Sequence, residues 1–105
     1  MDIEQLKALR AKLLEQTPQA RKIIAVLYDT ANWTTRDEIA AKLKKTRLNP
    51  HDIGLLDRLS ANDFVEIKKR DYPGRIGFEF IYRLKADIHR GLNLLRQFQR
   101  SKVNR

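Results

Sequence analysis

Residues 35–84 read TRDEIAAKLKKTRLNPHDIGLLDRLSANDFVEIKKRDYPGRIGFEFIYRL, and this stretch decides the fold. Its first four residues form a capping box, in which the Thr35 hydroxyl accepts from the Glu38 N–H and the Glu38 carboxylate accepts from the Thr35 N–H. A second helix start follows at Asn49-Pro50, where a capping side chain precedes a residue whose missing N–H costs nothing at the first helical position. We therefore expect two consecutive helices joined by a basic turn.

Beyond Asn62-Asp63 the apolar period changes from the 3.6 residues of a helix to the 2 of a strand. Tyr72-Pro73-Gly74-Arg75 suits a type II turn, because Pro presets φ at the second position and Gly accepts a positive φ at the third. The pattern therefore predicts a hairpin with alternating apolar residues in both strands. These apolar residues are Val65 and Ile67 in the first strand, and Ile76, Phe78, Phe80, Tyr82 and Leu84 in the second.

Helices are also predicted on both sides of this stretch. Residues 2–16, 18–28 and 86–100 carry apolar side chains at helical spacing. Trp33 is placed to begin a minimal extra strand that pairs with the hairpin. The expected fold class is α+β and mainly helical. In the central pair of helices, the expected buried residues are Ile39, Ala40 and Leu43, then Ile53, Leu56 and Leu59.

Length and charge limit the possible functions. With 105 residues the chain is expected to form one domain. Its 22 Lys and Arg against 13 Asp and Glu leave a net charge of +9, which favours a polyanionic partner, either nucleic acid or an acidic membrane surface. Cysteine is absent, so we expect no disulfide or thiolate metal site and a reducing, cytoplasmic location. No apolar run approaches the roughly 18 residues of a transmembrane helix.

Four segments carry a resemblance to a known group of proteins: residues 39–43 (IAAKL), 55–59 (LLDRL), 63–67 (DFVEI) and 81–84 (IYRL), the last before a final helix. Over about residues 18–100 the chain resembles winged helix-turn-helix transcriptional regulators, of which MarR-like and PadR-like proteins are the most similar. The resemblance implies a homodimer, a recognition helix in the major groove, and a hairpin wing that reaches the adjacent minor groove. Two features depart from the common pattern: the turn at residues 44–49 is longer, and Asp63 stands where Gly is usual.

The second helix of the central pair offers a face for reading DNA bases. On a helical wheel of residues 50–61, the side opposite the buried leucines carries His51, Gly54, Asp57 and Arg58. Arg58 can pair bidentately with a guanine edge, His51 can donate to a base or phosphate, and Gly54 lets the backbone approach closely. Phosphate contacts are expected from Arg36, Lys42, Lys44, Lys45, Arg47, Asn49, Lys68, Arg70 and Arg75.

Each of these features also has a purely structural interpretation. The basic run at residues 42–47 suits a solvated helix end, and residues 68–70 can protect an exposed strand edge from aggregation. Asp52 and Asp57 make the recognition helix poor in net positive charge, although Asp52 can cap its own helix. A winged-helix module that binds an acidic protein partner therefore stays open as an alternative to DNA binding. An enzyme is not expected, because the sequence offers neither a nucleophile with a base nor a metal cage.

The outer helices, residues 1–16 and 86–100, exceed what the winged core at residues 18–84 needs. Their apolar stripes require cover, and a two-fold partner supplies matching surface. We therefore expect a homodimer, although both helices can instead pack back on their own domain. A small-molecule effector, unidentified by any residue, would lie near Trp33 or Tyr28, and no cofactor or metal is expected. The expected dimer residues are Ile3, Leu6, Leu9, Leu13, Ile88, Leu92, Leu95 and Phe98.

Overall fold

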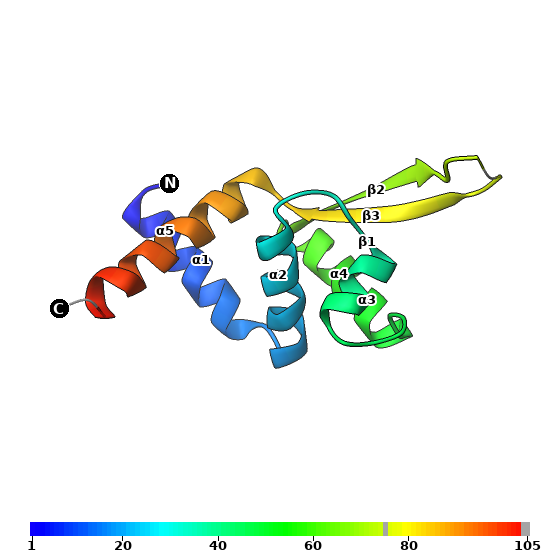
Figure 1. The fold of residues 1–105 in the computed structure, drawn as a ribbon. Coiled ribbons are helices and arrows are strands. Elements are labelled where there is room, and N and C mark those ends of the chain that lie inside the picture. The colour runs from blue at the N-terminus through cyan, green and yellow to red at the C-terminus, as the bar shows by residue number, and fades with distance from the viewer. Residues whose placement is uncertain (75, 104–105) are drawn as a thin grey trace.

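Five helices and a three-stranded antiparallel sheet form the described chain (Figure 1). The structure, a computed structural model, describes residues 1–74 and 76–103. The expected α+β, mainly helical class is confirmed. In chain order the elements are α1 (Ile3–Glu15), α2 (Pro18–Thr30), β1 (Thr34–Thr35), α3 (Arg36–Lys42), α4 (Pro50–Ala61), β2 (Val65–Asp71), β3 (Phe78–Leu84) and α5 (Ala86–Val103).

The helices begin where the sequence placed capping residues. The capping box of Thr35 and Glu38 opens α3, and Asn49 caps α4 by accepting from the Asp52 N–H at 2.8 Å. Thr17 caps α2 in the same way, with Pro18 at the first helical position. The first helix was expected to begin at Asp2. It begins one residue later, at Ile3, and Asp2 caps it. Local side-chain hydrogen bonds therefore set the helix boundaries.

The sheet has the strand order β1-β3-β2. The extra strand expected near Trp33 is present one residue later, and it pairs Thr34 with Tyr82 of β3. In the hairpin, Val65 pairs with Leu84 and Asp71 with Phe78. Gly74 has a φ of 71°, as the third position of a type II turn requires, whereas Arg75 lies outside the described residues.

The predicted alternation of the second strand is wrong at two positions. Ile76 does not belong to a strand: β3 begins at Phe78, and Ile76 is fully exposed, because the hairpin here has left the body of the protein. Ile81, expected on the polar side, is buried. Ile81 lies in the central strand, between Thr35 of β1 and Lys68 of β2. On the same face, the cations of Lys68 and Arg83 lie over the ring of Trp33, which precedes β1.

The core lies between α2, α3, α4 and the base of the hairpin. Tyr82 and Phe64 are its largest fully buried side chains. In α4 the buried leucines are Leu55, Leu56 and Leu59, whereas Ile53, expected in the core, is only half-buried. The other fully or almost fully buried apolar residues of this core include Ile23, Leu27, Ile39, Ala40 and Val65.

Asp63, at the entry to β2, is one of the two departures from the common winged-helix pattern, and its backbone conformation shows why Gly is usual there. Its φ of 64° lies in the left-handed region, which glycine adopts most easily and which Asp tolerates better than most residues. The Asp63 carboxylate accepts a hydrogen bond from Lys85 Nζ at 2.8 Å. That hydrogen bond and the charge of Lys85 lower the pKa of Asp63. The backbone shape usually supplied by Gly is therefore kept by a different residue.

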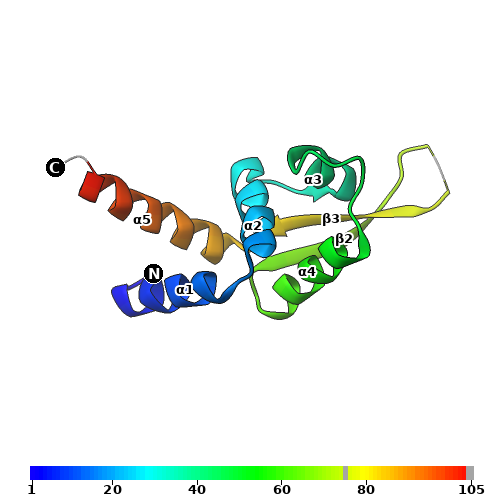
Figure 2. The same ribbon diagram turned by 90° about the horizontal axis from the view of Figure 1, so that it is seen from below.

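Helices α1 and α5 pack on each other at the end of the molecule opposite the hairpin, as Figures 1 and 2 show. They meet closely at Gly91, where an added Cβ would lie 2.4 Å from Leu9 Cδ2 and 2.9 Å from Met1 Sδ. Leu6 and Leu9 are buried within the single chain. Tyr28 joins α2 to α5, since its ring stacks on His89 and its hydroxyl donates to Asn93.

Candidate nucleic-acid interface

The turn between α3 and α4 is held by a buried carboxylate that the sequence analysis treated only as a helix cap. Asp52 is fully buried and accepts from Lys45 Nζ at 2.7 Å and from Gln19 Nε2 at 3.1 Å. It also accepts from the Asn49 N–H at 3.3 Å, which completes the capping box. Asp52 therefore ties the long turn and α2 to the first turn of α4, and so fixes the direction in which α4 points.

The charge of Asp52 is maintained by these partners. Burial alone raises the pKa of this carboxyl, because it disfavours the charged form. Hydrogen bonds from Lys45, Asn49 and Gln19, together with the positive charge of Lys45, outweigh burial and hold the pKa of Asp52 below its usual value. The carboxylate is thus ionised at neutral pH and neutralises a lysine within the turn.

The face of α4 that points away from the core carries the four residues predicted to contact bases. His51, Asp57 and Arg58 are exposed, and Gly54 lies between them on the same side of the helix. A Cβ added at Gly54 would meet no atom within 4 Å. This part of the backbone is therefore open to a close approach from outside.

The basic side chains around the turn fall into two groups. Lys42, Lys44 and Arg47 are exposed beside the start of α4, and Lys44 takes a φ of 60° in the turn. Lys45 and Arg36 are engaged within the chain: Lys45 pairs with Asp52, and Arg36 Nε donates to the Tyr82 hydroxyl at 2.8 Å. The Asn49 side chain, also predicted to contact phosphate, is occupied by capping α4.

The arginine of α3 is further held by an aromatic side chain of the wing. The Arg36 guanidinium carbon lies 4.6 Å from the centre of the Phe80 ring, and Phe80 is half-buried. Phe78, expected in the core together with Phe80 and Tyr82, is instead exposed on the wing. The aromatic row thus starts in the core at Tyr82 and continues outward along the hairpin.

The wing presents different cations on its two faces. Lys69 pairs with Phe80 in the sheet register, so it shares the face of Phe80 and Tyr82, and its Nζ lies 4.6 Å from the centre of the Phe78 ring. Lys68 and Arg70 have the opposite parity and lie on the outer face. There Lys68 approaches Trp33, and Arg70 forms an ion pair with Glu79.

Lys69 was therefore missed as a candidate contact by the sequence analysis. The signal that identifies it is strand parity: Lys69 aligns with the buried side of the hairpin, and Lys68 and Arg70 do not. The exposed side of α4, the turn and this face of the wing each carry exposed cations, and Gly54 leaves open space on α4.

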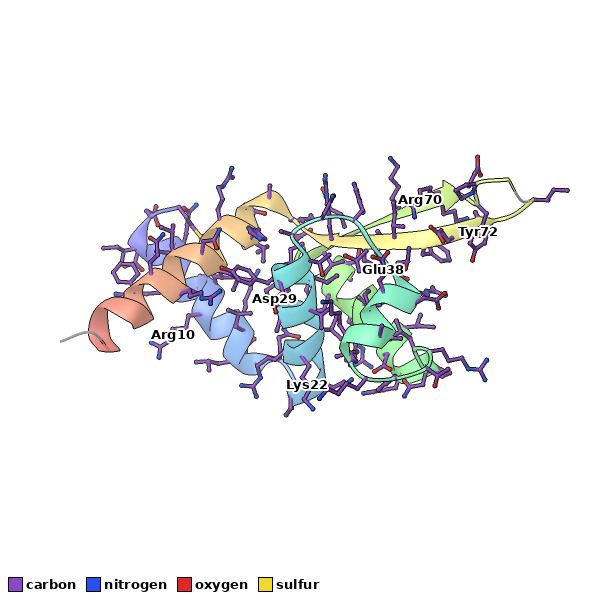
Figure 3. The ribbon with its side chains drawn as sticks, viewed as in Figure 1. Arg10, Lys22, Asp29, Glu38, Arg70 and Tyr72 are labelled. Atoms are coloured by element: carbon purple, nitrogen blue, oxygen red, sulfur yellow. The ribbon has the colours of Figure 1, made fainter. Side chains whose placement is uncertain are left out.

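A groove of about 680 Å³ opens between α1, α2 and α5, at the other end of the chain. Its wall includes the predicted dimer residues Leu13, Leu92 and Leu95, which are half-buried, and Ile3 and Phe98, which are 65% and 56% exposed. Leu6 also lines it, whereas Leu9 and Ile88 do not. Tyr28 lines the groove, but Trp33 lies on the outer face of the sheet. Arg10, Arg21 and Arg96 also line it, and Figure 3 labels Arg10 on α1.

Two other kinds of site are absent from the part of the chain that the structure describes. Within residues 1–74 and 76–103, no three His, Cys, Asp or Glu side chains gather in a way that could hold a metal ion. Among the helices described, none is long and apolar enough to cross a membrane.

Comparison with solved structures identifies the fold. The structure of diamide-treated YodB from B. subtilis is 22% identical, with a TM-score of 0.57 over 98% of this chain and 90% of that one. A possible transcriptional regulator from Methanosarcina mazei is 14% identical, with a TM-score of 0.60 over 93% and 82%. The Q18P mutant of MepR from S. aureus is 12% identical, with a TM-score of 0.58 over 95% and 71%.

The chain has a winged helix-turn-helix fold. The resemblance to winged-helix regulators expected from the sequence is thereby confirmed for the fold. No protein-family model matches the sequence, and neither does any curated protein. Within this fold, α4 occupies the position of a recognition helix and the β2–β3 hairpin that of a wing.

Proposed function

We propose that this winged helix-turn-helix protein is a dimeric transcriptional regulator that binds double-stranded DNA with sequence specificity. The observation that supports this most directly is the outer face of α4, where Arg58 and His51 flank a glycine with open space around it. A helix that enters the major groove needs side chains that reach base edges, and a glycine on its outer face lets the backbone come closer to them.

Base readout is assigned to the exposed face of α4. Arg58 would donate two hydrogen bonds to a guanine edge, and Asp57 would accept from a cytosine amino group. His51, in the first turn, would donate to a base or a phosphate. Gly54 would allow the helix backbone to come close to the base pairs. Since a good bidentate contact contributes about 1–3 kcal/mol of discrimination, Arg58 is the principal specificity residue.

Phosphate contacts are assigned first to the exposed cations Lys42, Lys44, Arg47 and Lys69. Arg75 is proposed as a further contact from the turn of the wing, outside the described residues. Three further predicted phosphate contacts are proposed to have a second role, which is to hold α4 and the wing in place through hydrogen bonds within the chain: Lys45, Asn49 and Arg36. Lys68 and Arg70 would reach DNA only from the outer face of the wing.

The second copy is proposed to occupy the groove between α1, α2 and α5. Its apolar wall includes Ile3, Leu13 and Phe98, which a partner helix can cover. A two-fold dimer formed there would place two recognition helices about one DNA turn, roughly 34 Å, apart. A small-molecule effector is proposed to bind near Tyr28, which lines the same groove. The protein is proposed to act in the cytoplasm.

A selection experiment tests this proposal. The purified protein is mixed with random-sequence duplex DNA at about 150 mM salt, and the retained duplexes are sequenced. The proposal predicts an inverted repeat with half-site centres about 10 base pairs apart. Retention that shows no sequence preference and disappears as salt rises would refute it, because charge alone then explains binding.

The second candidate function is a module that binds an acidic protein partner. Asp57 counts against DNA binding by α4, because it places a negative charge at the edge of the exposed face, whereas the cations of the turn and wing suit an acidic protein as well as DNA. In the selection experiment such a module would retain duplexes without sequence preference, and the retention would disappear as salt rises. The same experiment therefore separates the two functions.

A further inference from the structure

The wing ends in an apolar tip that the proposed base and phosphate contacts do not use. Ile76 is fully exposed, Phe78 is 49% exposed and Tyr72 is 41% exposed. Figure 1 shows that the hairpin projects well beyond α3 and α4, and Figure 3 shows Tyr72 near its outer end. The other large exposed apolar side chains described lie at the opposite end: Met1 before α1, Ile3 and Leu14 in α1, and Phe98 in α5. The tip is therefore a separate feature from the groove.

The two aromatic rings of the tip are held in place by their neighbours. Phe78 packs edge-on against Phe80, with ring centres 5.5 Å apart. The Tyr72 ring lies 3.7 Å from the position of a Cβ on Gly77, and the Tyr72 N–H donates to the Gly77 carbonyl at 3.3 Å. Ile76 stands between these two supported rings in the sequence, and its side chain projects entirely into solvent. The hairpin end thus presents one fully exposed aliphatic side chain between two partly covered rings.

Among the described residues of the tip, positive and negative charges balance, so the exposed apolar side chains distinguish it. Lys69 lies next to Phe78, with its Nζ 4.6 Å from the ring centre, and Arg70 neutralises Glu79. Asp71 adds one negative charge in register with Phe78. Duplex DNA offers phosphates to the cations, and stacked base pairs to an inserted apolar side chain. Minor-groove proteins use Phe, Leu, Ile, Met and Pro in this way, as wedges that partly unstack one base step.

We propose that the wing tip is a DNA wedge, in which Ile76 inserts between two base pairs at the minor groove and kinks the duplex. This inference rests on the proposed DNA-binding function. Insertion of an apolar side chain bends DNA by about 20–90° toward the major groove. It also favours pyrimidine–purine steps, because these unstack most easily. The wing would therefore add a sequence preference at a site where it makes no hydrogen bond to a base.

The test measures DNA bending with a duplex of about 30 base pairs that carries a donor and an acceptor fluorophore at its two ends. The duplex is the sequence retained most strongly in the selection described above. Wild-type protein is expected to raise energy transfer on binding. Ile76→Ala should still bind the duplex but should lose most of this rise, and Ile76→Met should keep it. Because the Ile76 side chain is fully exposed, neither variant should change the unfolding transition.

The possible outcomes separate the two proposals. Binding with equal energy transfer for wild type and Ile76→Ala, or binding with no rise at all, overturns the wedge and leaves the DNA-binding function intact. Failure of wild-type protein to bind any duplex overturns both. If Ile76→Ala alters the sedimentation of the free protein, the tip is instead a contact with a second copy, and the wedge is again refuted.

Discussion

Gly54 provides a prediction in which folding stability and DNA affinity change in opposite directions. Glycine in a helix interior is less favourable than alanine by about 0.8–1.0 kcal/mol. In this chain an added methyl group would touch no other atom within 4 Å, so no clash offsets the gain. Gly54→Ala should therefore raise the free energy of unfolding by about 0.5–1 kcal/mol. That corresponds to a Tm increase of roughly 2–8 °C for a domain of this size.

The same methyl group should weaken DNA binding if the α4 backbone lies against the base pairs. Placing extra volume in a closely packed site costs about 1–3 kcal/mol, so the Kd for the selected duplex should rise about 5- to 150-fold. Urea unfolding gives the stability, and fluorescence anisotropy with a labelled duplex gives the affinity. Higher stability with unchanged affinity would refute the close approach of α4 to DNA.

Gly91 supplies a matched control in the other glycine-containing helix. Gly91→Ala gains the same helix propensity, but its methyl group would lie 2.4 Å from Leu9 Cδ2, so the buried Leu9 side chain must move. The stability gain should therefore be smaller than that of Gly54→Ala, or become a loss. An equal gain at both positions would contradict the packing of α1 against α5.

Four other substitutions, one of them a control, test the remaining parts of the interface and the dimer. Lys69→Ala should weaken binding to all duplexes alike and reduce the salt slope by about one, whereas Lys68→Ala on the outer face should do neither; equal losses would refute the assignment of faces. Asp52→Asn should lower the free energy of unfolding by about 1–3 kcal/mol at pH 7. Because the pKa of Asp52 is lower in the folded chain than its unfolded value of 3.8, this stabilisation is present above that pH and is lost as the pH falls below it. Acid titration of stability should thus be flatter in Asp52→Asn, and an unchanged acid limb would count against the buried pair. Phe98→Glu should leave the chain folded but give a monomer by sedimentation, since Phe98 is 56% exposed on the groove; a persisting dimer would place the interface elsewhere.

The order of elements could be predicted from the sequence because local signals determine it. Capping residues such as Thr35 and Asn49 mark helix starts by hydrogen bonds within one turn, and alternation of apolar residues marks the hairpin. The exposed face of α4 followed from the same periodicity, and its four predicted residues do lie outside the core.

Features that depend on distant contacts could not be predicted in this way. The carboxylate of Asp52 is joined to Gln19, which lies 33 residues earlier, and no local pattern indicates that pairing. Ile81 is buried on the face of the sheet where Trp33 also lies, although the alternation of its own strand predicted that face to be polar. Ile76 fits the alternation of apolar residues and was therefore predicted to lie in the strand. It is exposed because the hairpin has left the core at this point, and the alternation does not indicate where the core ends.

The most direct test of the central claim is the ratio of affinities for two duplexes, the selected sequence and a scrambled version of it, at about 150 mM salt. A sequence-specific regulator should prefer the selected duplex by at least about 10³-fold. Arg58→Ala should reduce that ratio by about 5- to 150-fold, the equivalent of the roughly 1–3 kcal/mol expected for one bidentate base contact. A wild-type ratio near one, or an Arg58→Ala variant that loses the same affinity for both duplexes, would contradict base readout by α4.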